Sequence, residues 1–225
     1  MSSQLSTLQR TRIKICGLTR PQDVDTAVRA GADAVGLVFY GPSKRAVGLG
    51  QAASLRQRVP AFVDVVALFV NASTHEVEQV IEQVQPDLLQ FHGDESPEFC
   101  TSFKQRYMRA FRVGGPGLDT PEAVLAACRR YPSASAWLFD SYSTGYGGSG
   151  LSFDPELLSA VRQAPDSRSI VLAGGLKADT VAHSLKMVQP YAVDVSSGVE
   201  DAPGIKSEQK IAAFVQSVAS ASMHR

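Results

Sequence analysis

Eight short apolar segments alternate with eight longer amphipathic segments along this chain, and no other feature of the sequence limits the fold as strongly. The short segments are rich in the β-branched residues that favour strands, whereas the longer ones carry apolar residues at the three- and four-residue spacing of one helix face. The predicted strands are Ile13–Cys16, Ala34–Phe39, Asp64–Val70, Leu88–Phe91, Tyr107–Val113, Ala136–Phe139, Ser169–Leu172 and Ala192–Val195. The predicted helices are Pro21–Ala30, Gly50–Arg58, Thr74–Gln83, Pro97–Arg106, Thr120–Tyr131, Pro155–Gln163, Asp179–Gln189 and Ser207–Ser220.

The predicted strands are apolar at successive positions, as in Val65–Val70, so both of their faces are expected to be buried, as in a parallel sheet. They start about 20–35 residues apart, which is the size of one strand–helix unit. Eight such units in 225 residues can close into a single (β/α)8 TIM barrel of the α/β class, and an open doubly wound sheet is the alternative. We expect residues 1–10 to form a flexible N-terminal tail and residues 11–225 to form the barrel domain.

Residues at the ends of the predicted helices support these boundaries. Ser73 precedes the helix that begins at Thr74, and Glu76 stands three residues after Ser73, which is the spacing of an N-terminal capping box. Pro21 and Pro97 fit first-turn positions, where a missing N–H group costs nothing.

The composition argues against several classes of function. Lys+Arg and Asp+Glu are both 22, so no cationic excess is available to neutralise nucleic-acid phosphates, although backbone N–H groups could still bind one small anion. No segment approaches the ~18 apolar residues of a membrane span. The three cysteines, Cys16, Cys100 and Cys128, are widely spaced, which predicts free thiols in the reducing cytoplasm and no structural metal site.

In a barrel, the chemistry lies at the C-terminal ends of the strands and in the loops that follow them. Cys16 ends the first predicted strand, and strand alternation points Lys14 and Cys16 to the same side, into the barrel. An ionised thiol there could abstract a proton, and Lys14 is a cation that could favour the thiolate. The alternative is that Cys16 is a small packed hydrophobe.

Three further candidates follow other strands. Asp140 comes directly after a strongly apolar strand, where a carboxyl group could act as a general acid or, alternatively, stabilise a loop. Arg45 follows the second strand and could hold a substrate carboxylate through a two-pronged contact, or could be a solvated loop residue. His92 ends the fourth strand and is a candidate wall residue of the site.

Glycine-rich segments follow the last three predicted strands, and they predict a phosphate site, because glycines let backbone amides approach an anion closely. Barrels often bind a phosphate between the loops after strands seven and eight. Ordinary turns are the alternative. The candidate phosphate-binding residues are Gly147, Gly148, Gly174, Gly175, Ser197 and Gly198.

These motifs occur in the order typical of one enzyme family. They are Lys14-Ile-Cys-Gly17, Ser43-x-Arg45-x-Val47, Val66-Ala-Leu-Phe-Val-Asn71, Leu89-Gln-Phe-His-Gly93, Asp140 with Gly147-Gly-Ser-Gly150, Leu172-Ala-Gly-Gly-Leu176 and Val193-Asp-Val-Ser-Ser-Gly-Val-Glu200. Together they resemble the phosphoribosylanthranilate isomerase family of tryptophan biosynthesis, over nearly the whole chain. Two departures are Ser149 in place of Thr, and Pro155 where the family more often has Trp.

The resemblance implies a (β/α)8 barrel that catalyses an Amadori rearrangement. N-(5′-phosphoribosyl)anthranilate becomes 1-(2-carboxyphenylamino)-1-deoxy-D-ribulose 5-phosphate. It implies that Cys16 is the general base, that Asp140 is the general acid and that Arg45 faces the anthranilate carboxylate. Asp194 and His92 match site-lining positions of the family. Its phosphate cradle falls on Gly174, Gly175, Ser197 and Gly198, helped by Gly147 and Gly148.

The same resemblance fixes the expected partners. The phosphorylated aminosugar is the expected small-molecule substrate, and no nucleic acid or membrane is expected to bind. No metal or organic cofactor is expected, because the iminium of the opened sugar already acidifies the proton to be removed. We expect a cytoplasmic monomer, whose amphipathic helices all fit the outer ring of one barrel.

Three rival functions remain open at this point. An indole-glycerol-phosphate synthase resembles this chain in the last two phosphate loops, but it needs a Lys and Glu pair that the other strand ends do not offer. A Schiff-base aldolase would use Lys14, which lies deeper than Cys16. A non-catalytic binding protein could keep the barrel, but we would not expect it to retain both Cys16 and Asp140.

Overall fold

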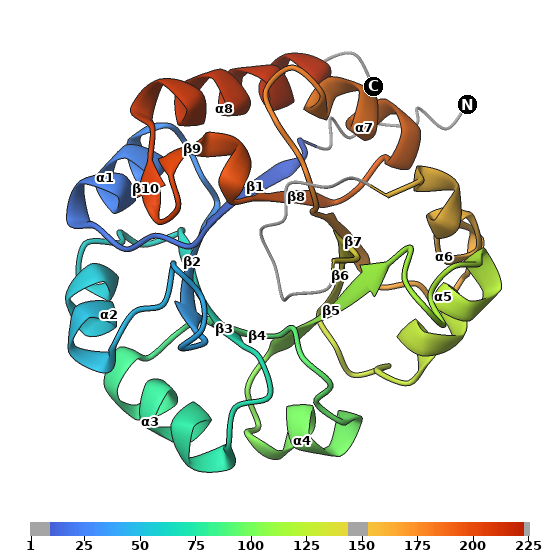
Figure 1. The fold of residues 1–225 in the computed structure, drawn as a ribbon, viewed down its shortest axis with the longest axis horizontal. Coiled ribbons are helices and arrows are strands. Elements are labelled where there is room, and N and C mark those ends of the chain that lie inside the picture. Colours follow the sequence, from blue (N-terminus) through green and yellow to red (C-terminus); the bar gives the residue numbers. More distant parts are fainter. Residues whose placement is uncertain (1–9, 144–152, 223–225) are drawn as a thin grey trace, which may run out of the picture.

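The structure is a computed structural model that describes residues 10–143 and 153–222. Eight parallel strands form a closed barrel in the order in which they occur along the chain, and a ring of helices surrounds it (Figure 1). The predicted (β/α)8 barrel is therefore confirmed, and an open sheet is excluded. The barrel strands are β1 (Arg12–Cys16), β2 (Ala34–Phe39), β3 (Asp64–Phe69), β4 (Leu88–Phe91), β5 (Tyr107–Val113), β6 (Ala136–Ser141), β7 (Ser169–Leu172) and β8 (Ala192–Val195).

The helices agree with the predicted positions, with shifts at their ends. The α-helices are α1 (Pro21–Arg29), α2 (Leu49–Arg56), α3 (Thr74–Val84), α4 (Pro97–Ser102), α5 (Pro121–Arg129), α6 (Ser159–Gln163), α7 (Val181–Val188) and α8 (Glu208–Ser222). Two short 3-10 helices, η1 (Pro155–Leu158) and η2 (Ser197–Val199), precede α6 and follow β8. A small hairpin of β9 (Glu200–Ala202) and β10 (Ile205–Lys206) lies between η2 and α8.

Three differences from the sequence prediction have local causes. The helix predicted over Pro97–Arg106 ends at Ser102, because Lys104 adopts a left-handed backbone with φ 53°. The strand predicted over Ala136–Phe139 continues to Ser141, which brings Asp140 into the barrel wall. The β9–β10 hairpin was not predicted, since its strands are too short to show a periodic pattern.

The capping box predicted at the start of α3 is present. Ser73 Oγ accepts a hydrogen bond from the backbone N–H of Glu76, and the Glu76 carboxylate accepts one from the backbone N–H of Ser73 at 2.8 Å. These reciprocal contacts satisfy two of the N–H groups that a helix start leaves without partners.

Two layers of apolar side chains pack on opposite faces of the strands. The larger layer lies between the barrel and its helices, with Phe69, Phe91 and Trp137 among its fully buried members. The smaller layer faces the barrel interior and includes Val66, Met108, Ala110, Leu138 and Val171. Because these inward residues precede the last residues of their strands, they seal the lower part of the interior, and the C-terminal end holds polar groups beside a smaller apolar cluster of Val38, Leu68 and Val70.

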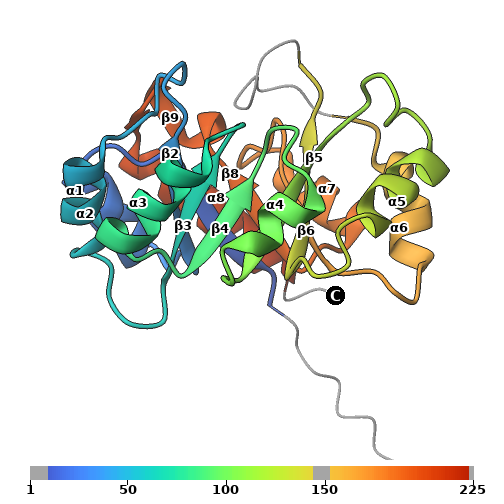
Figure 2. The ribbon, with the colours of Figure 1, turned by 90° about the horizontal axis from the view of Figure 1, so that it is seen from below.

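The barrel closes between β8 and β1, where Asp194 lies beside Lys14 in the parallel register. Figure 2 shows the hairpin strand β9 at the end of the barrel toward which the strands point. This closure brings together segments that are far apart in the chain. Lys14 and Asp194, for example, are 180 residues apart in sequence and in contact in the barrel.

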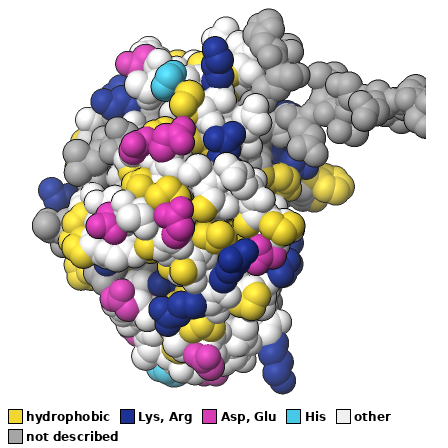
Figure 3. Space-filling view, turned by 90° about the vertical axis from the view of Figure 1, so that its right-hand side faces the viewer, with side chains coloured by type: hydrophobic (Ala, Val, Ile, Leu, Met, Phe, Trp, Pro, Cys, Tyr) yellow, Lys and Arg dark blue, Asp and Glu magenta, His cyan; other side chains and the backbone are white. Residues whose placement is uncertain are grey.

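The surface carries charges of both signs. On the face drawn in Figure 3, Lys and Arg side chains are interspersed with Asp and Glu, and apolar side chains are scattered between them. Each helix in the described ranges is too short or too polar to cross a bilayer. Arg10, the one described residue of the predicted N-terminal tail, forms an ion pair with Asp33, and residues 1–9 lie outside the described residues.

Candidate active site

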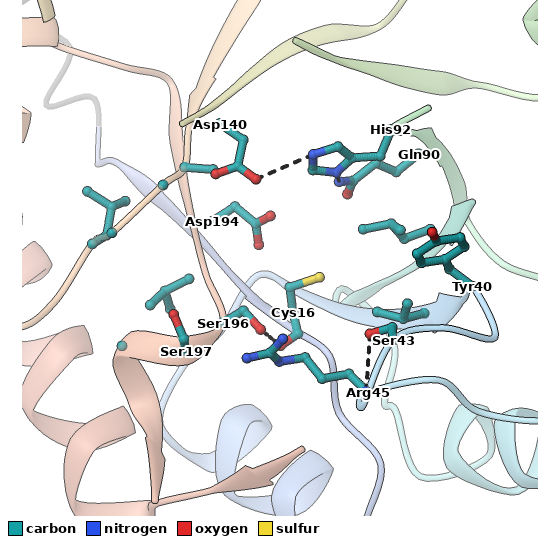
Figure 4. A pocket seen from close by; sticks show the side chains of 18 of the residues that line it. Cys16, Tyr40, Ser43, Arg45, Gln90, His92, Asp140, Asp194, Ser196 and Ser197 are labelled. Carbon is teal, nitrogen blue, oxygen red and sulfur yellow. Dashed lines mark hydrogen bonds and ion pairs between the residues drawn. The ribbon is translucent and has the colours of Figure 1, made fainter. Parts of the chain in front are cut away.

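A pocket opens at the C-terminal end of the barrel, and it gathers nearly all of the residues singled out in the sequence (Figure 4). Its wall contains side chains that come from β1, β4, β6, β8 and the loops after β2, β7 and β8. The predicted residues that line it are Cys16, Arg45, His92, Asp140, Gly174, Gly175, Asp194, Ser197 and Gly198. Gly147 and Gly148 lie outside the described residues.

Cys16 ends β1 and contributes its thiol to the pocket, while Lys14 lies deeper on the same side of the strand. Gly36 on the neighbouring strand makes room for both, because a Cβ atom there would lie 2.8 Å from Cys16 Sγ and 3.0 Å from Lys14 Nζ. Burial raises the pKa of the Cys16 thiol above its ordinary value, although Lys14 and Lys206 pull the pKa in the opposite direction. The thiol is thus shielded from solvent and lies near cations. These cations favour the thiolate, which is the form that can remove a proton from carbon.

Lys14 and Asp194 form a buried ion pair in the barrel interior, with Nζ and Oδ1 3.0 Å apart. Burial alone would lower the pKa of Lys14, but Asp194 and Cys16 outweigh it and hold that pKa above its ordinary value. Lys14 is therefore a charged partner of Asp194 and not the neutral amine that a Schiff base requires, which argues against the aldolase alternative.

Asp140 lies across the pocket from Cys16 and faces His92 (Figure 4). Its Oδ1 accepts a hydrogen bond from the backbone N–H of Ser141 at 2.9 Å, and its Oδ2 lies 3.4 Å from His92 Nε2. On the other side of the ring, Gln90 Nε2 lies 3.2 Å from His92 Nδ1. An amide nitrogen only donates, so this orientation of the Gln90 amide makes Nδ1 the acceptor and assigns the ring proton to Nε2, on the side of Asp140.

The loops after β7 and β8 form a cradle of backbone groups. Gly174 adopts φ +79°, and a Cβ atom there would lie 2.3 Å from Ser141 Oγ. At Gly198 a Cβ atom would lie only 1.9 Å from the carbonyl oxygen of Leu176, so the two loops touch through this glycine. Within the described ranges, the N–H groups of Gly174 and Gly175 have no hydrogen-bond partner, so they can bind an anion.

Arg45 lies in the pocket, but its contacts differ from the expected ones. Its Nε and Nη2 donate to the two oxygens of Glu200, at 2.8 and 2.7 Å. Glu200 thus occupies one edge of the guanidinium, and the N–H groups of Nη1 together with the second N–H of Nη2 remain for a substrate carboxylate. Glu200 in turn accepts a hydrogen bond from Lys206 at 2.8 Å.

Sequence reasoning did not single out Gln90, which lines the pocket, nor three residues that lie against the lining: Gly36, Glu200 and Lys206. Gly36 and Gln90 each interrupt an apolar strand, which is a signal that could have found them. Glu200 and Lys206 carry no such signal, because their importance depends on the hairpin and on a contact with Arg45 that is 155 residues away in the chain. In the described part of the chain, no group of three or more potential metal ligands occurs.

Comparisons with known proteins agree with this geometry. The sequence model of one family, described as N-(5′-phosphoribosyl)anthranilate (PRA) isomerase, matches residues 13–217. The N-(5′-phosphoribosyl)anthranilate isomerase of Bordetella parapertussis is 61% identical over 211 residues, which cover 94% of this chain and 97% of that protein.

This chain belongs to the N-(5′-phosphoribosyl)anthranilate isomerase family.

Solved structures of the isomerase family support the assignment. The phosphoribosylanthranilate isomerase of Thermotoga maritima superposes with a TM-score of 0.83 at 36% identity, covering 92% of this chain and 98% of that one. A phosphoribosylanthranilate isomerase in complex with reduced 1-(o-carboxyphenylamino)-1-deoxyribulose 5-phosphate superposes with a TM-score of 0.80 at 33% identity, with the same coverage. The family resemblance and the isomerase function predicted from the sequence are confirmed, and the roles of individual residues stay predictions.

Proposed function

We propose that this chain isomerises N-(5′-phosphoribosyl)anthranilate to 1-(2-carboxyphenylamino)-1-deoxy-D-ribulose 5-phosphate, with Cys16 as general base and Asp140 as general acid. The observation that carries this proposal is that one pocket holds a thiol from β1, a carboxyl group from β6 and a cradle of backbone amides from the loops after β7 and β8. An acid and a base on different walls suit a reaction that opens a sugar ring and then moves a proton between carbons.

The proposed reaction has two stages. Asp140 donates a proton to the furanose ring oxygen, and the ring opens to a protonated Schiff base between the anthranilate nitrogen and C1. The Cys16 thiolate then removes the proton from C2, and the electron pair of that bond neutralises the iminium to give an enolamine. Tautomerisation of the enolamine gives the ketone. Ser141 N–H and His92 Nε2–H both face the Asp140 carboxyl group, so they would stabilise the carboxylate that remains after the first stage.

Two anchors would hold the ends of the substrate, so that the sugar lies between acid and base. The amides of Gly174 and Gly175, with Ser197 and Gly198 beside them, suit the 5′-phosphate. Arg45 suits the anthranilate carboxylate through Nη1 and the second N–H of Nη2, because Glu200 occupies only the Nε edge of the guanidinium. We expect Arg45→Ala to raise KM more than it lowers kcat.

The experiment that tests the proposal is a fluorescence assay of purified protein, in which the signal of phosphoribosylanthranilate falls as it reacts. Cys16→Ala and Asp140→Asn should each lower kcat at least roughly a hundredfold with an unchanged circular dichroism spectrum, because each removes one proton-transfer group. A variant with wild-type turnover would remove that residue from its role, and an inert wild-type protein that still binds a phosphorylated aryl ligand would favour a binding protein.

We also propose that the protein works as a monomer in the cytoplasm. One chain supplies both proposed proton-transfer groups and the amide cradle of the pocket. Cys16, Cys100 and Cys128 are all free and buried, which suits a reducing compartment. Light scattering on a size-exclusion column gives the mass directly, and a mass near twice 24.0 kDa would overturn the monomer.

A further inference from the structure

The β9–β10 hairpin brings two charged side chains, Glu200 and Lys206, into contact with Arg45 and Ser196 of the pocket wall, and the proposed proton transfers use neither of them. Both residues are buried, with exposed fractions of 9% and 4%. A buried Lys and a buried Glu need strong compensation, because each charge loses its contact with water. Their partners therefore show what the hairpin does for the site.

Glu200 lies between two cations. Its two oxygens accept hydrogen bonds from Arg45 Nε and Nη2, and Oε1 also accepts one from Lys206 Nζ at 2.8 Å. Burial alone would raise the pKa of Glu200, but Arg45 and Lys206 outweigh it and hold that pKa below its ordinary value. Glu200 is thus a carboxylate that binds both cations at once.

Lys206 is also connected to the strand end that carries Cys16. Its Nζ donates to the carbonyl oxygen of Ser196 at 3.2 Å and lies 3.4 Å from Ser196 Oγ. Ser196 Oγ donates in turn to the carbonyl oxygen of Cys16 at 3.0 Å (Figure 4). Two hydrogen bonds therefore separate the Lys206 ammonium from the backbone of Cys16.

The described charged groups near Cys16 form two clusters. Lys14 on β1 is paired with Asp194 on β8, so these two charges balance. Arg45 after β2 and Lys206 on β10 share the single carboxylate of Glu200 on β9, so this second cluster carries one net positive charge among the described residues, while the Asp140 carboxyl group lines the pocket opposite Cys16. A thiolate at Cys16 would balance the net positive charge of the second cluster.

We propose that Lys206 and Glu200 are positioning residues that set the electrostatic potential at the Cys16 thiol. Lys206 supplies a second cation, besides Lys14, that stabilises the thiolate. Glu200 offsets part of the positive charge of Lys206 and Arg45. This inference rests on the proposed role of Cys16 as the base. The pKa values bear on it in two ways. Burial and Asp194 raise the pKa of the Cys16 thiol while Lys206 acts to lower it, and burial lowers the pKa of Lys206 itself although Glu200 acts against this.

The two residues carry opposite charges, so their neutral variants should have opposite effects. The readout is the rate at which iodoacetamide alkylates Cys16, measured against pH and located by mass spectrometry. Lys206→Met should move the midpoint of this profile up by about one pH unit, and Glu200→Gln should move it down. Cys100 and Cys128 are scored separately by the mass spectrometry, and only Cys16 of the three cysteines lines the pocket.

Matched controls distinguish an effect of the charge near Cys16 from a general effect of the substitution on charge or folding. Lys186→Met on α7 and Glu82→Gln on α3 remove the same charges from exposed positions and should leave the midpoint unchanged. Lys206→Arg keeps the cation and should restore a midpoint close to that of the wild-type protein. If Lys206→Met does not fold, Lys206→Gln, which can still donate to Ser196 and Glu200, is measured in its place.

The outcomes discriminate between the inference and the proposed function. Shifts of the same sign in the two variants, or no shift in either, would overturn the inference whatever the activity. Opposite shifts in a protein that does not turn over phosphoribosylanthranilate would support the charge network and refute the isomerase. In an active protein, the rising limb of kcat/KM against pH should move in the same direction as the alkylation midpoint.

Discussion

A methyl group on Gly36 would lie 2.8 Å from Sγ of Cys16 and 3.0 Å from Nζ of Lys14, closer than ordinary van der Waals contact. The thiol and the ammonium occupy space that any other residue type at this position would fill. The smallest side chain in the wall thus determines where the proposed base can lie, although it takes no part in the chemistry. This dependence can be tested with a single substitution.

We expect Gly36→Ala to fold and to lower kcat by about 10- to 100-fold, because displacing a reacting group by about 1 Å costs that much. The backbone itself does not oppose the change, since Gly36 is not among the residues with positive φ. The measurement is kcat together with the thermal midpoint. Gly50→Ala, where a Cβ atom meets nothing within 4 Å, is the control and should retain wild-type kcat. A fully active Gly36→Ala would show that the thiol tolerates displacement.

The pH dependence of activity should follow the Cys16 thiol. Its folded-state pKa lies above the ordinary value, mainly because of burial, and the base works only when deprotonated. The value of kcat/KM, which reports the free enzyme, should therefore keep rising as the pH increases past about 8.5, the ordinary thiol range. A rate profile between pH 6 and 10 measures this, and a plateau already reached at pH 7.5 would contradict it.

Part of the site could be predicted from single residues. Cys16 and Asp140 are polar groups at the ends of apolar strands, which is where a barrel carries its chemistry, and both line the pocket. Glu200 and Lys206 could not be predicted in this way, because a charge in a loop has the same pattern whether it is solvated or buried. The contact of Glu200 with Arg45 forms only when the barrel closes, and Lys206 binds the same carboxylate.

At the scale of elements, helix α3 shows how local sequence sets a boundary. Ser73 and Glu76 satisfy the first N–H groups of α3 reciprocally, and the sequence spacing alone predicted this arrangement. The barrel strands were predicted equally well, since strands buried on both faces form distinct apolar runs. The boundaries that were wrong depend on features without a periodic pattern, such as the left-handed Lys104 after α4.

We expect Ser73→Ala to lower the free energy of unfolding by about 1 kcal/mol, because the cap bond to the Glu76 N–H is lost. In a chain of this length that corresponds to a fall of about 2–4 °C in Tm. Thermal unfolding followed by circular dichroism measures the change. Ser220→Ala, at an exposed position of α8, is the control and should leave Tm unchanged or slightly higher. An equal fall in both variants would show that the cap contributes nothing.

At the scale of the whole molecule, the two ends of the described chain meet. The backbone N–H of Thr11 lies 3.4 Å from Ser222 Oγ, so β1 begins where α8 ends. All eight strands contribute to one closed sheet, and no edge strand is left in the barrel. The fold should therefore tolerate termini placed at another loop, provided that this loop lies away from the pocket.

A circular permutant should exploit this closure. In this permutant a short Gly/Ser linker joins Ser222 to Arg10, and the chain starts at Asp166. We expect it to fold and to keep kcat/KM within about tenfold of the wild-type value. Pro165 and Asp166 are exposed at the end of the barrel opposite the pocket. Opening the chain between Gly174 and Gly175 is the comparison, and it should raise KM strongly because it cuts the phosphate cradle. Loss of folding in the first permutant would show that the order of the strands matters.

Closure of the barrel between its first and last strands has a consequence for the synthesis of the protein itself on the ribosome. Cys16 leaves the ribosome about 180 residues before Ser196, which contacts it, and before Glu200 and Lys206, which follow Ser196 in the chain. A nascent chain halted after seven strands would carry the proposed base on an unclosed sheet, without the anion cradle or the neighbouring cations. The proposed activity would thus appear only after the eighth strand and the hairpin behind it have been synthesised and have closed onto the first strand.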